Sequence, residues 1–377
     1  MNKIDFITLS RSDYASLSPI YAYFKEQRYF NANLIFGGSH CLKRFGHSKD
    51  KIQVEFPEAL CMLDFLHSDK DLPSDLTEAS GRLVTQMHNY LRNSKPDAVF
   101  IVGDRWELLP VAYTCFLNRI PVLHHSGGDM TQGSMDNQTR YALTNLSNLH
   151  FVGLEKHRDR LLSVGEEPWR VSVVGEPALN QATRTAHFIS EEHNHHKVEH
   201  TLATFHPCLG DSLNIPEQTD FFLNCLREIP GKIIITGPNP DAYSSIVFDK
   251  IQNFNRKHSN VVFEENLGSA YYEVLAKATL LIGNSSSGIW ETATFRVPTI
   301  NIGLRQEGRT RQSHVIDILY EISSFRRAMA QIKSKKYIDE IANLENIYYD
   351  KSGLSNIHKA TKENIMKNNL INKKMLL

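Results

Sequence analysis

The segment GNSSSGIWETATFRVPTINIG (283–303) has residue types and spacing suited to binding a phosphate. It overlaps the end of the apolar run LLIGN (280–284), so Ser285, Ser286 and Ser287 fall at the start of the next predicted helix. Backbone N–H groups at a helix start are unpaired and partly positive, and serine hydroxyls add further donors. The alternative is a capped helix with ordinary serines. We predict a phosphate cradle, although neither the Walker pattern nor the GxGxxG fingerprint is present.

Two further features of this region suit a nucleotide. Glu291 lies about one and a half turns into the predicted helix, where a carboxylate can accept hydrogen bonds from two neighbouring hydroxyls, as on a ribose. Arg305 and Arg309 in GLRQEGRTR are candidates to hold the phosphates together with the cradle.

Acidic and basic side chains gather in two other segments, each of which follows an apolar run. AVFIVG (98–103) is followed by Asp104 and Arg105 in GDRWELL. PVLHH (121–125) leads into HHSGGDMTQGSMDNQTR, a glycine-containing loop with the charged residues Asp129, Asp136 and Arg140. Asp136 and Arg140 are four residues apart, on one face of the expected helix. A surface ion pair on a flexible loop is the alternative; the density of charge favours a functional loop.

Three shorter polar segments also follow apolar runs. SRSDY places Arg11 and Asp13 on the turn into a helix, where a surface arginine and a capping aspartate are the alternative. TFHP places His206 directly after a strand, and GPNPD places Asn239 and Asp241 on a proline-containing loop. Each segment alone would be a turn. Together with the serine cradle they predict a surface suited to a nucleoside diphosphate.

Parallel sheets with crossover helices are the elements that must position these residues. Short apolar runs alternate with segments of helical period, which is typical of α/β folds. Six runs fall at 4–9, 34–38, 98–103, 121–125, 149–153 and 171–175, and five more fall at 201–205, 232–237, 261–265, 280–284 and 298–303. We predict two Rossmann-like domains, 1–178 and 179–377, with the active site in the cleft between them.

Composition and charge exclude several classes of function. The 377 residues carry 42 Lys plus Arg and 42 Asp plus Glu, so no net charge attracts nucleic acid or an acidic membrane. The five cysteines form no CxxC pair and favour a reducing compartment. No signal peptide or long apolar stretch is present, which predicts a soluble cytoplasmic protein. The histidine-rich stretch SEEHNHHKVEH (190–200) is interpreted as a polar loop and not as a metal site. The tail 362–377 is expected to be a closing helix or a frayed end.

These motifs, in this order and spacing from residue 11 to residue 309, resemble the hydrolysing UDP-N-acetylglucosamine 2-epimerases of sialic and legionaminic acid synthesis. The resemblance implies a GT-B type architecture, with the last helix packing back on the N-terminal domain. It also implies elimination of the nucleoside diphosphate to a 2-acetamidoglycal, followed by hydration with inversion at C2, without a metal or NAD. A UDP-linked 2-acetamido sugar is the implied partner, and a homodimer or homotetramer the implied assembly.

The resemblance also assigns roles to individual residues. The implied acid–base group is Asp104, Asp129 and Asp136 with Arg140 close by. The implied substrate-binding residues are Arg11, Asp13, Arg105, His206, Asn239, Asp241, Ser285, Ser286, Gly288, Glu291 and Arg305.

The loop that contains Asp129 departs from the family pattern at three positions. The family usually has Glu at Asp129, an acid at Asn137 and His at Tyr141. Aspartate is one methylene shorter than glutamate, asparagine cannot take up a proton, and tyrosine is a far weaker base than histidine. These changes indicate a different sugar, such as a 2,4-diacetamido-6-deoxy hexose, or altered chemistry. Another GT-B enzyme, such as a glycosyltransferase or a non-hydrolysing epimerase, and a binding protein without turnover are the alternatives.

Overall fold

The computed structural model describes residues 1–43, 48–66, 71–191 and 199–374, and it contains two parallel sheets. The seven-stranded sheet has the order β3-β2-β1-β4-β5-β6-β7. Its strands are β1 Lys3–Thr8, β2 Asn31–Gly37, β3 Leu60–Leu63, β4 Ala98–Val102, β5 Val122–His125, β6 Leu149–Val152 and β7 Val171–Val173. The six-stranded sheet has the order β10-β9-β8-β11-β12-β13. Its strands are β8 His200–Thr204, β9 Lys232–Thr236, β10 Val261–Glu264, β11 Ala278–Gly283, β12 Thr299–Ile302 and β13 Val315–Ile318.

All eleven predicted runs are strands, and the α/β class with two parallel sheets is confirmed. Strands β3 and β13, which are the outer strands on one side of each sheet, were not predicted from the sequence. Three of the four residues of β3 are exposed, including Leu60 at 47%, and β13 (VIDI) is only partly buried. A central parallel strand is covered on both faces and forms a continuous apolar run, whereas an edge strand need not.

Helices cover the sheets and join successive strands. Those around the first sheet are α1 Arg11–Gln27, α2 Lys49–Glu55, α3 Pro73–Ser94, α4 Leu108–Leu117, α5 Asp136–Leu146 and α6 Glu155–Ser163. The later helices are α7 Leu179–Glu191, α8 Ile215–Arg227, α9 Ser244–Lys257, α10 Tyr271–Ala276, α11 Ser287–Trp290, α12 Thr292–Phe295, α13 Ile322–Ile332, α14 Lys335–Ala342 and α15 Gly353–Asn364. Short 3₁₀ turns lie at Gly38–Cys41, Pro168–Arg170 and Gly268–Ala270. None of the helices in the described ranges is both long and apolar enough to cross a membrane.

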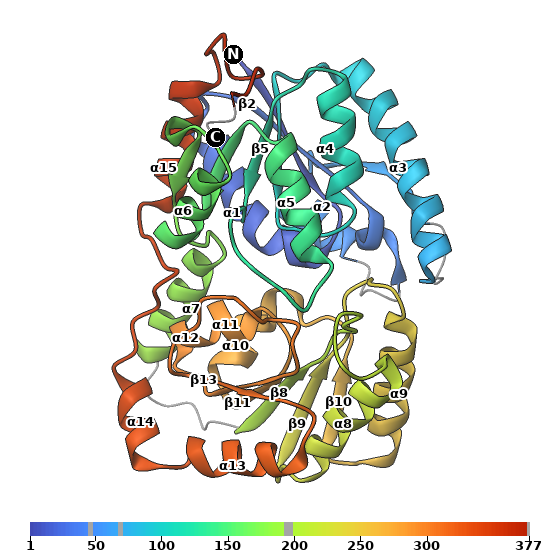
Figure 1. The fold of residues 1–377 in the computed structure, drawn as a ribbon, viewed down its shortest axis with the longest axis vertical. Helices are drawn as coiled ribbons and strands as arrows, with labels where there is room; N and C mark the ends of the chain where they lie inside the picture. Colours follow the sequence, from blue (N-terminus) through green and yellow to red (C-terminus); the bar gives the residue numbers. More distant parts are fainter. Residues whose placement is uncertain (44–47, 67–70, 192–198, 375–377) are drawn as a thin grey trace.

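The molecule has two lobes, one around each sheet, which we call the N-terminal and C-terminal lobes (Figure 1). Stacked rings join the strands of the first core, with Phe100 5.2 Å from Phe6 and 5.6 Å from Phe151 between ring centroids. In the second core the rings of Phe205 and Phe222 stack at 4.9 Å. Each lobe therefore has its own hydrophobic centre.

The chain crosses between the lobes twice. Helix α7 begins at Leu179 and packs against α10 and α12 of the C-terminal lobe. After α14 the chain returns, and α15 packs against α1 and β7 of the N-terminal lobe (Figure 1). Residues 192–198 of the histidine-rich stretch lie outside the described part of the chain.

The segment after α15 is fixed to the N-terminal lobe by Arg170, which is 1% exposed. Its guanidinium donates to the carbonyls of Asn369 (2.8 Å), Leu370 (2.7 Å) and Asn148 (3.0 Å). Leu370 is itself 2% exposed in the first core. The tail is thus neither a continuous helix nor a frayed end between residues 365 and 374, because one buried cation binds its carbonyl groups.

Arg170→Ala should therefore lower the free energy of unfolding by about 3 kcal/mol, because it leaves buried carbonyls without donors. Urea denaturation measures the change, and limited proteolysis should cut the segment after α15 earlier than in the wild type. Arg327→Ala on exposed α13 is the control, with an expected change within about 0.5 kcal/mol. Equal effects of the two variants would contradict this role of Arg170.

Candidate active site between the two lobes

Asp104 lies on a tight turn at the end of β4. Gly103 has a φ of 97°, a conformation that favours glycine. The turn is fixed from β5: the N–H of Gly103 donates to the carbonyl of His125 (3.0 Å), and Nε2 of His124 donates to the carbonyl of Gly103 (2.7 Å). This fixes the backbone immediately before the Asp104 carboxylate.

The loop between β5 and α5 lies against the C-terminal lobe. The N–H of Gln132 donates to the carbonyl of Glu307 at 2.9 Å. A Cβ on Gly133 would lie 2.1 Å from the carbonyl oxygen of Leu304, so only glycine allows this close approach. The loop that contains Asp129 and leads into α5 at Asp136 is therefore shaped by both lobes.

Asp129 is 4% exposed and contacts two basic side chains. Its Oδ1 lies 3.3 Å from Nε2 of His157 on α6, and its Oδ2 lies 3.3 Å from Nη1 of Arg309. Oδ1 also accepts a hydrogen bond from the N–H of Met130 (2.8 Å). Burial opposes ionisation, but Arg309 and His157 hold the pKa of Asp129 well below its ordinary value. Asp129 is a carboxylate in the folded protein.

Arg140 joins the segments that contain Asp104 and Asp129. Its Nη2 pairs with Oδ2 of Asp104 and donates to the hydroxyl of Thr131 at 3.1 Å, and its Nη1 donates to the carbonyl of Asp129 at 3.1 Å. Arg309 approaches Asp104 from the other lobe at 3.6 Å. Although burial alone would raise the pKa of Asp104, Arg140 and Arg309 lower it. Asp104 is therefore also ionised.

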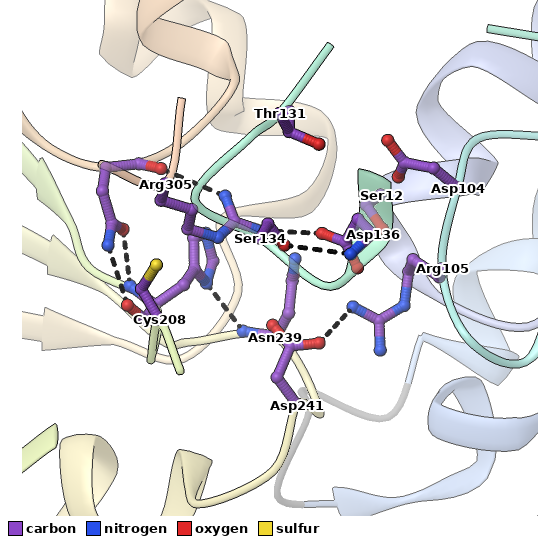
Figure 2. Close-up of polar contacts among 12 residues, drawn as sticks. Ser12, Asp104, Arg105, Thr131, Ser134, Asp136, Cys208, Asn239, Asp241 and Arg305 are labelled. Atoms are coloured by element: carbon purple, nitrogen blue, oxygen red, sulfur yellow. Dashed lines mark hydrogen bonds and ion pairs between the residues drawn. The ribbon is translucent and has the colours of Figure 1, made fainter. Parts of the chain in front are cut away.

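Asp136 differs from the other two acids in its surroundings. It is the first residue of α5, and its carboxylate lies 3.7 Å from Nη2 of Arg305 (Figure 2). This contact is longer than those that Asp104 and Asp129 make with arginines. Burial and the negative charges of Asp104 and Asp241 raise the pKa of Asp136 to about 6. The pKa of Asp136 therefore lies above its ordinary value, whereas those of Asp104 and Asp129 lie below it.

The C-terminal lobe contributes His206 and Asn284, which fix one another. Oδ1 of Asn284 accepts from the N–H of His206 (2.7 Å), and its Nδ2 donates to the His206 carbonyl (2.8 Å). Nδ1 of His206 accepts from the N–H of Asn239 at 3.0 Å, so the neutral ring has its proton on Nε2. Burial and the charge of Arg305 lower the pKa of His206 well below its usual value. His206 therefore provides an uncharged donor.

The carbonyl of Asn284 ties this pair to the loop after β12. It accepts hydrogen bonds from Nη1 of Arg305 (3.1 Å) and from Nε2 of Gln306 (2.8 Å). Arg305 consequently bridges Asn284 in its own lobe and Asp136 in the other. Figure 2 shows Arg305 beside Asp136. The sequence analysis missed Asn284, although it stands inside GNSSSGIWE.

The serine segment forms two single-turn helices, α11 and α12, where the sequence analysis expected one helix. Thr292 accounts for the break, since its hydroxyl donates to the carbonyl of Gly288 (2.9 Å), a side-chain bond that bends helices. Ser285 Oγ accepts from the N–H of Ser287 (3.3 Å), and Ser286 directly precedes α11. A Cβ on Gly288 would lie 2.7 Å from Thr299, so Gly288 permits α11 to pack on β12.

The remaining predicted binding residues make contacts within the protein. Arg11 Nη1 donates to the carbonyl of Glu265 (2.6 Å). Arg105 lies 2.8 Å from Asp241 (Figure 2), so both arginines join the lobes. Glu291 accepts a hydrogen bond from the hydroxyl of Tyr272 (2.9 Å).

Asp13 stabilises the turn into α1 by accepting hydrogen bonds from the residues that precede the helix. Its carboxylate accepts from the N–H groups of Leu9 (3.0 Å) and Ser10 (3.1 Å) and from the hydroxyl of Thr8 (2.6 Å). Burial raises the pKa of Asp13 to about 6. This arrangement corresponds to the capping alternative considered from the sequence.

Asn137 and Tyr141, two of the positions that depart from the family pattern, differ in where they lie relative to the acids. Oδ1 of Asn137 accepts from the N–H of Thr131 (3.0 Å) and from Nη1 of Arg140 (3.4 Å), so Asn137 supports the loop. Tyr141 is 39% exposed and lies outside the buried group.

Glu176 is a further acid that the sequence analysis missed. It stands just before the predicted domain boundary at residue 178 and is 4% exposed. Its Oε2 lies 3.9 Å from Nδ1 of His125, whose Nε2 donates to the carbonyl of Gly175 (3.0 Å). Burial and the charge of Asp129 raise the pKa of Glu176 to about 8. Its position directly after an apolar run was the available signal.

Comparison with known proteins places the chain in a family. The profile of the family described as UDP-N-acetylglucosamine 2-epimerase matches residues 22–362. The GDP/UDP-N,N'-diacetylbacillosamine 2-epimerase (hydrolyzing) of Campylobacter jejuni is 31% identical over 344 residues, 89% of this chain and 88% of that protein. The UDP-N,N'-diacetylbacillosamine 2-epimerase (hydrolyzing) of Legionella pneumophila is 26% identical over 84% of this chain and 85% of that protein.

The fold is likewise shared with solved structures. The crystal structure of UDP-GlcNAc 2-epimerase from Neisseria meningitidis bound to UDP-GlcNAc superimposes with a TM-score of 0.79. The superposition covers 96% of this chain and 100% of the Neisseria meningitidis chain, and the two are 17% identical in sequence. The expected two-lobed, GT-B-like architecture is confirmed.

The buried proton of Glu176 makes the stability of the folded protein depend on pH. The folded protein retains this proton up to about pH 8, whereas an unfolded chain releases it near the ordinary value of 4.5. Stability of the wild type therefore falls as the pH rises between these values. Glu176→Gln removes this dependence, so its stability relative to wild type should increase by about 1 kcal/mol or more from pH 5 to pH 8.

Thermal unfolding at pH 5, 6, 7 and 8 measures this change. The exposed Glu273→Gln on α10 is the control and should give a difference that varies little with pH. A constant difference between Glu176→Gln and wild type would show that Glu176 does not hold a proton.

Proposed function

Because the chain belongs to the UDP-N-acetylglucosamine 2-epimerase family, we propose that it is a hydrolysing 2-epimerase acting on a UDP-linked 2-acetamido sugar. The products are UDP and a free sugar of the manno configuration. The observation that carries the proposal is the group of three carboxyl groups where the lobes meet, two held ionised by arginines and one, Asp136, with its pKa raised to about 6. Homo-oligomeric assembly and a cytoplasmic location stay predictions.

The first half of the reaction needs a base and a site for the leaving diphosphate. Asp136 suits the base, because a group with a pKa of about 6 is mostly ionised at neutral pH yet can hold a proton. It takes the proton from C2, the bond from C1 to the diphosphate oxygen breaks, and a C1–C2 double bond forms. Arg305 and Nε2–H of His206 stabilise the negative charge on the diphosphate, together with Ser285 and Ser286.

The second half adds water to the glycal. Oxygen from water bonds to C1, and a solvent-derived proton adds to C2 from the face opposite the one that lost its proton. Of the two ionised carboxylates, Asp104 is the more exposed, with 16% of its side chain accessible against 4% for Asp129. Asp104 is therefore our candidate for orienting the water. Arg140 fixes Asp104 relative to the loop.

The identity of the sugar is inferred from the relatives and from the altered loop. Two relatives named as hydrolysing enzymes act on N,N'-diacetylbacillosamine nucleotides, and the one from Campylobacter jejuni is named for both GDP and UDP forms. A 2,4-diacetamido-6-deoxy hexose linked to UDP is therefore our first candidate substrate. UDP-N-acetylglucosamine is the second, because the family bears its name.

Incubation of the protein with each sugar nucleotide in deuterated water tests the reaction. We expect release of UDP and one deuterium at C2 of a free manno-configured sugar, measured by NMR and mass spectrometry. Epimerised sugar still linked to UDP would indicate a non-hydrolysing epimerase. Turnover only with an added acceptor would indicate a glycosyltransferase, and thermal protection without turnover a binding protein.

Asp136→Asn should lower kcat by about 10² or more while UDP affinity measured by calorimetry stays nearly unchanged. In the wild type, kcat/KM should fall as the pH is lowered through about 6, because protonated Asp136 cannot accept the C2 proton. The exposed Asp249→Asn on α9 is the control and should retain wild-type rates. An acid limb that persists unchanged in Asp136→Asn would assign the base to another residue.

Arg305→Ala and Ser286→Ala should behave in the opposite way. Because these residues lie on the diphosphate side of the site, their loss should raise the dissociation constant for UDP, by about three- to fivefold per lost contact. If they changed kcat alone, as Asp136→Asn should, the division between base and diphosphate site would be wrong.

A further inference from the structure

A histidine outside the predicted set lies against one of the three acids. His157, the third residue of α6, has 2% of its side chain exposed, and its Nε2 lies 3.3 Å from Oδ1 of Asp129. Nothing in the sequence singled it out, because it falls within the helical segment after β6. It approaches Asp129 from the N-terminal lobe, whereas Arg309 approaches the other carboxylate oxygen from the C-terminal lobe.

The imidazole of His157 is held on several sides. The backbone at residue 157 contacts the acid loop so closely that a Cβ on Gly128 would lie 2.2 Å from the His157 carbonyl oxygen. The ring lies 6.2 Å from that of Tyr348, and a Cβ on Gly153 would lie 3.6 Å from Nδ1. A ring confined in this way can fix the direction of the carboxylate that it contacts.

The position of the Arg309 guanidinium depends on where the Asp129 carboxylate lies. Its guanidinium stacks over the Trp290 ring at 4.3 Å and lies 3.3 Å from Asp129 and 3.6 Å from Asp104. One cation is therefore shared by two carboxylates. Without His157, Asp129 would depend more strongly on Arg309, which would draw the guanidinium away from Asp104.

We propose that His157 is a positioning residue that holds the Asp129 carboxylate through Nε2 and thereby keeps Arg309 shared between Asp129 and Asp104. The inference rests on the proposed function, because it concerns the acids of that reaction. His157 touches neither the sugar nor the diphosphate in this scheme. It acts through Asp129, and its loss misplaces the ionised pair while the nucleotide contacts of the C-terminal lobe persist.

A double-mutant cycle tests the inference. His157→Phe should lower kcat by about 10²-fold, the scale expected when a reacting group is misplaced by about 1 Å, with KM within about threefold of wild type. His157→Gln should recover part of the loss, because its amide nitrogen keeps a polar N–H group beside the Asp129 carboxylate. The double variant with Asp129→Asn and His157→Phe should have a kcat within about threefold of that of Asp129→Asn alone.

His150→Gln provides the matched control. His150 is another buried histidine of the N-terminal lobe, 3.4 Å from the carboxylate of Glu166. Its effect on kcat should be the same in the wild type and in the Asp129→Asn background. If His157→Phe and Asp129→Asn reduced kcat in a multiplicative way, or if His157→Gln were as slow as His157→Phe, the positioning role would be overturned.

The melting temperatures of the same variants give a readout that does not require turnover. A smaller loss from His157→Phe in the Asp129→Asn background than in the wild type supports the contact, and additive losses overturn it. Absence of UDP release by the wild type with every sugar nucleotide would contradict the proposed function instead. The two failures are therefore distinguishable.

Discussion

The site depends on the electrostatic balance between carboxylates and arginines in a place that is largely closed to water. Asp104 and Asp129 share Arg309, the charge of Asp104 acts on Asp136, and each acid would be costly to bury as an unpaired charge. The compensating cations come from both lobes, with Arg140 from the N-terminal lobe and Arg305 and Arg309 from the C-terminal lobe. The contact between the lobes is consequently part of the chemistry of the site.

Unequal compensation gives the three acids different properties. Asp104 and Asp129 each have an arginine nitrogen no more than 3.3 Å from a carboxylate oxygen, and this positive charge keeps them ionised. Asp136 has a more distant arginine and faces two other negative charges, which raises its pKa to about 6. Groups of one chemical type can act as base and as electrostatic support when their surroundings separate their pKa values. The difference among the three acids comes from the distances and directions of their neighbours.

The strand ends of the N-terminal sheet provide the rigid support for this arrangement. His124 and His125 are adjacent on β5, so their side chains point to opposite faces of the sheet. Their Nε2 atoms donate to the carbonyls of Gly103 and Gly175, the glycines that precede Asp104 and Glu176. Burial lowers the pKa of His124 to about 3 and that of His125 to about 4, so both rings are neutral at ordinary pH. Two neutral histidines thus fix the turns that carry two acids.

The amino-acid sequence was sufficient to predict the class of fold, the central strands and the segments that meet at the site. Buried parallel strands are continuous apolar runs, and a parallel sheet brings the residues after its strands to one edge, so GDRWE, the loop after PVLHH and GNSSS were identifiable. The edge strands β3 and β13 were missed because their residues are partly exposed. His157, Glu176 and Asn284 were also missed. No local pattern separates a histidine on a helix from one that contacts a carboxylate, whereas Glu176 and Asn284 stand at the ends of apolar runs, where a signal was available. Which acid is ionised and which arginine joins the lobes became clear only in the folded chain, because Coulomb energies and desolvation depend on distances between residues far apart in the sequence.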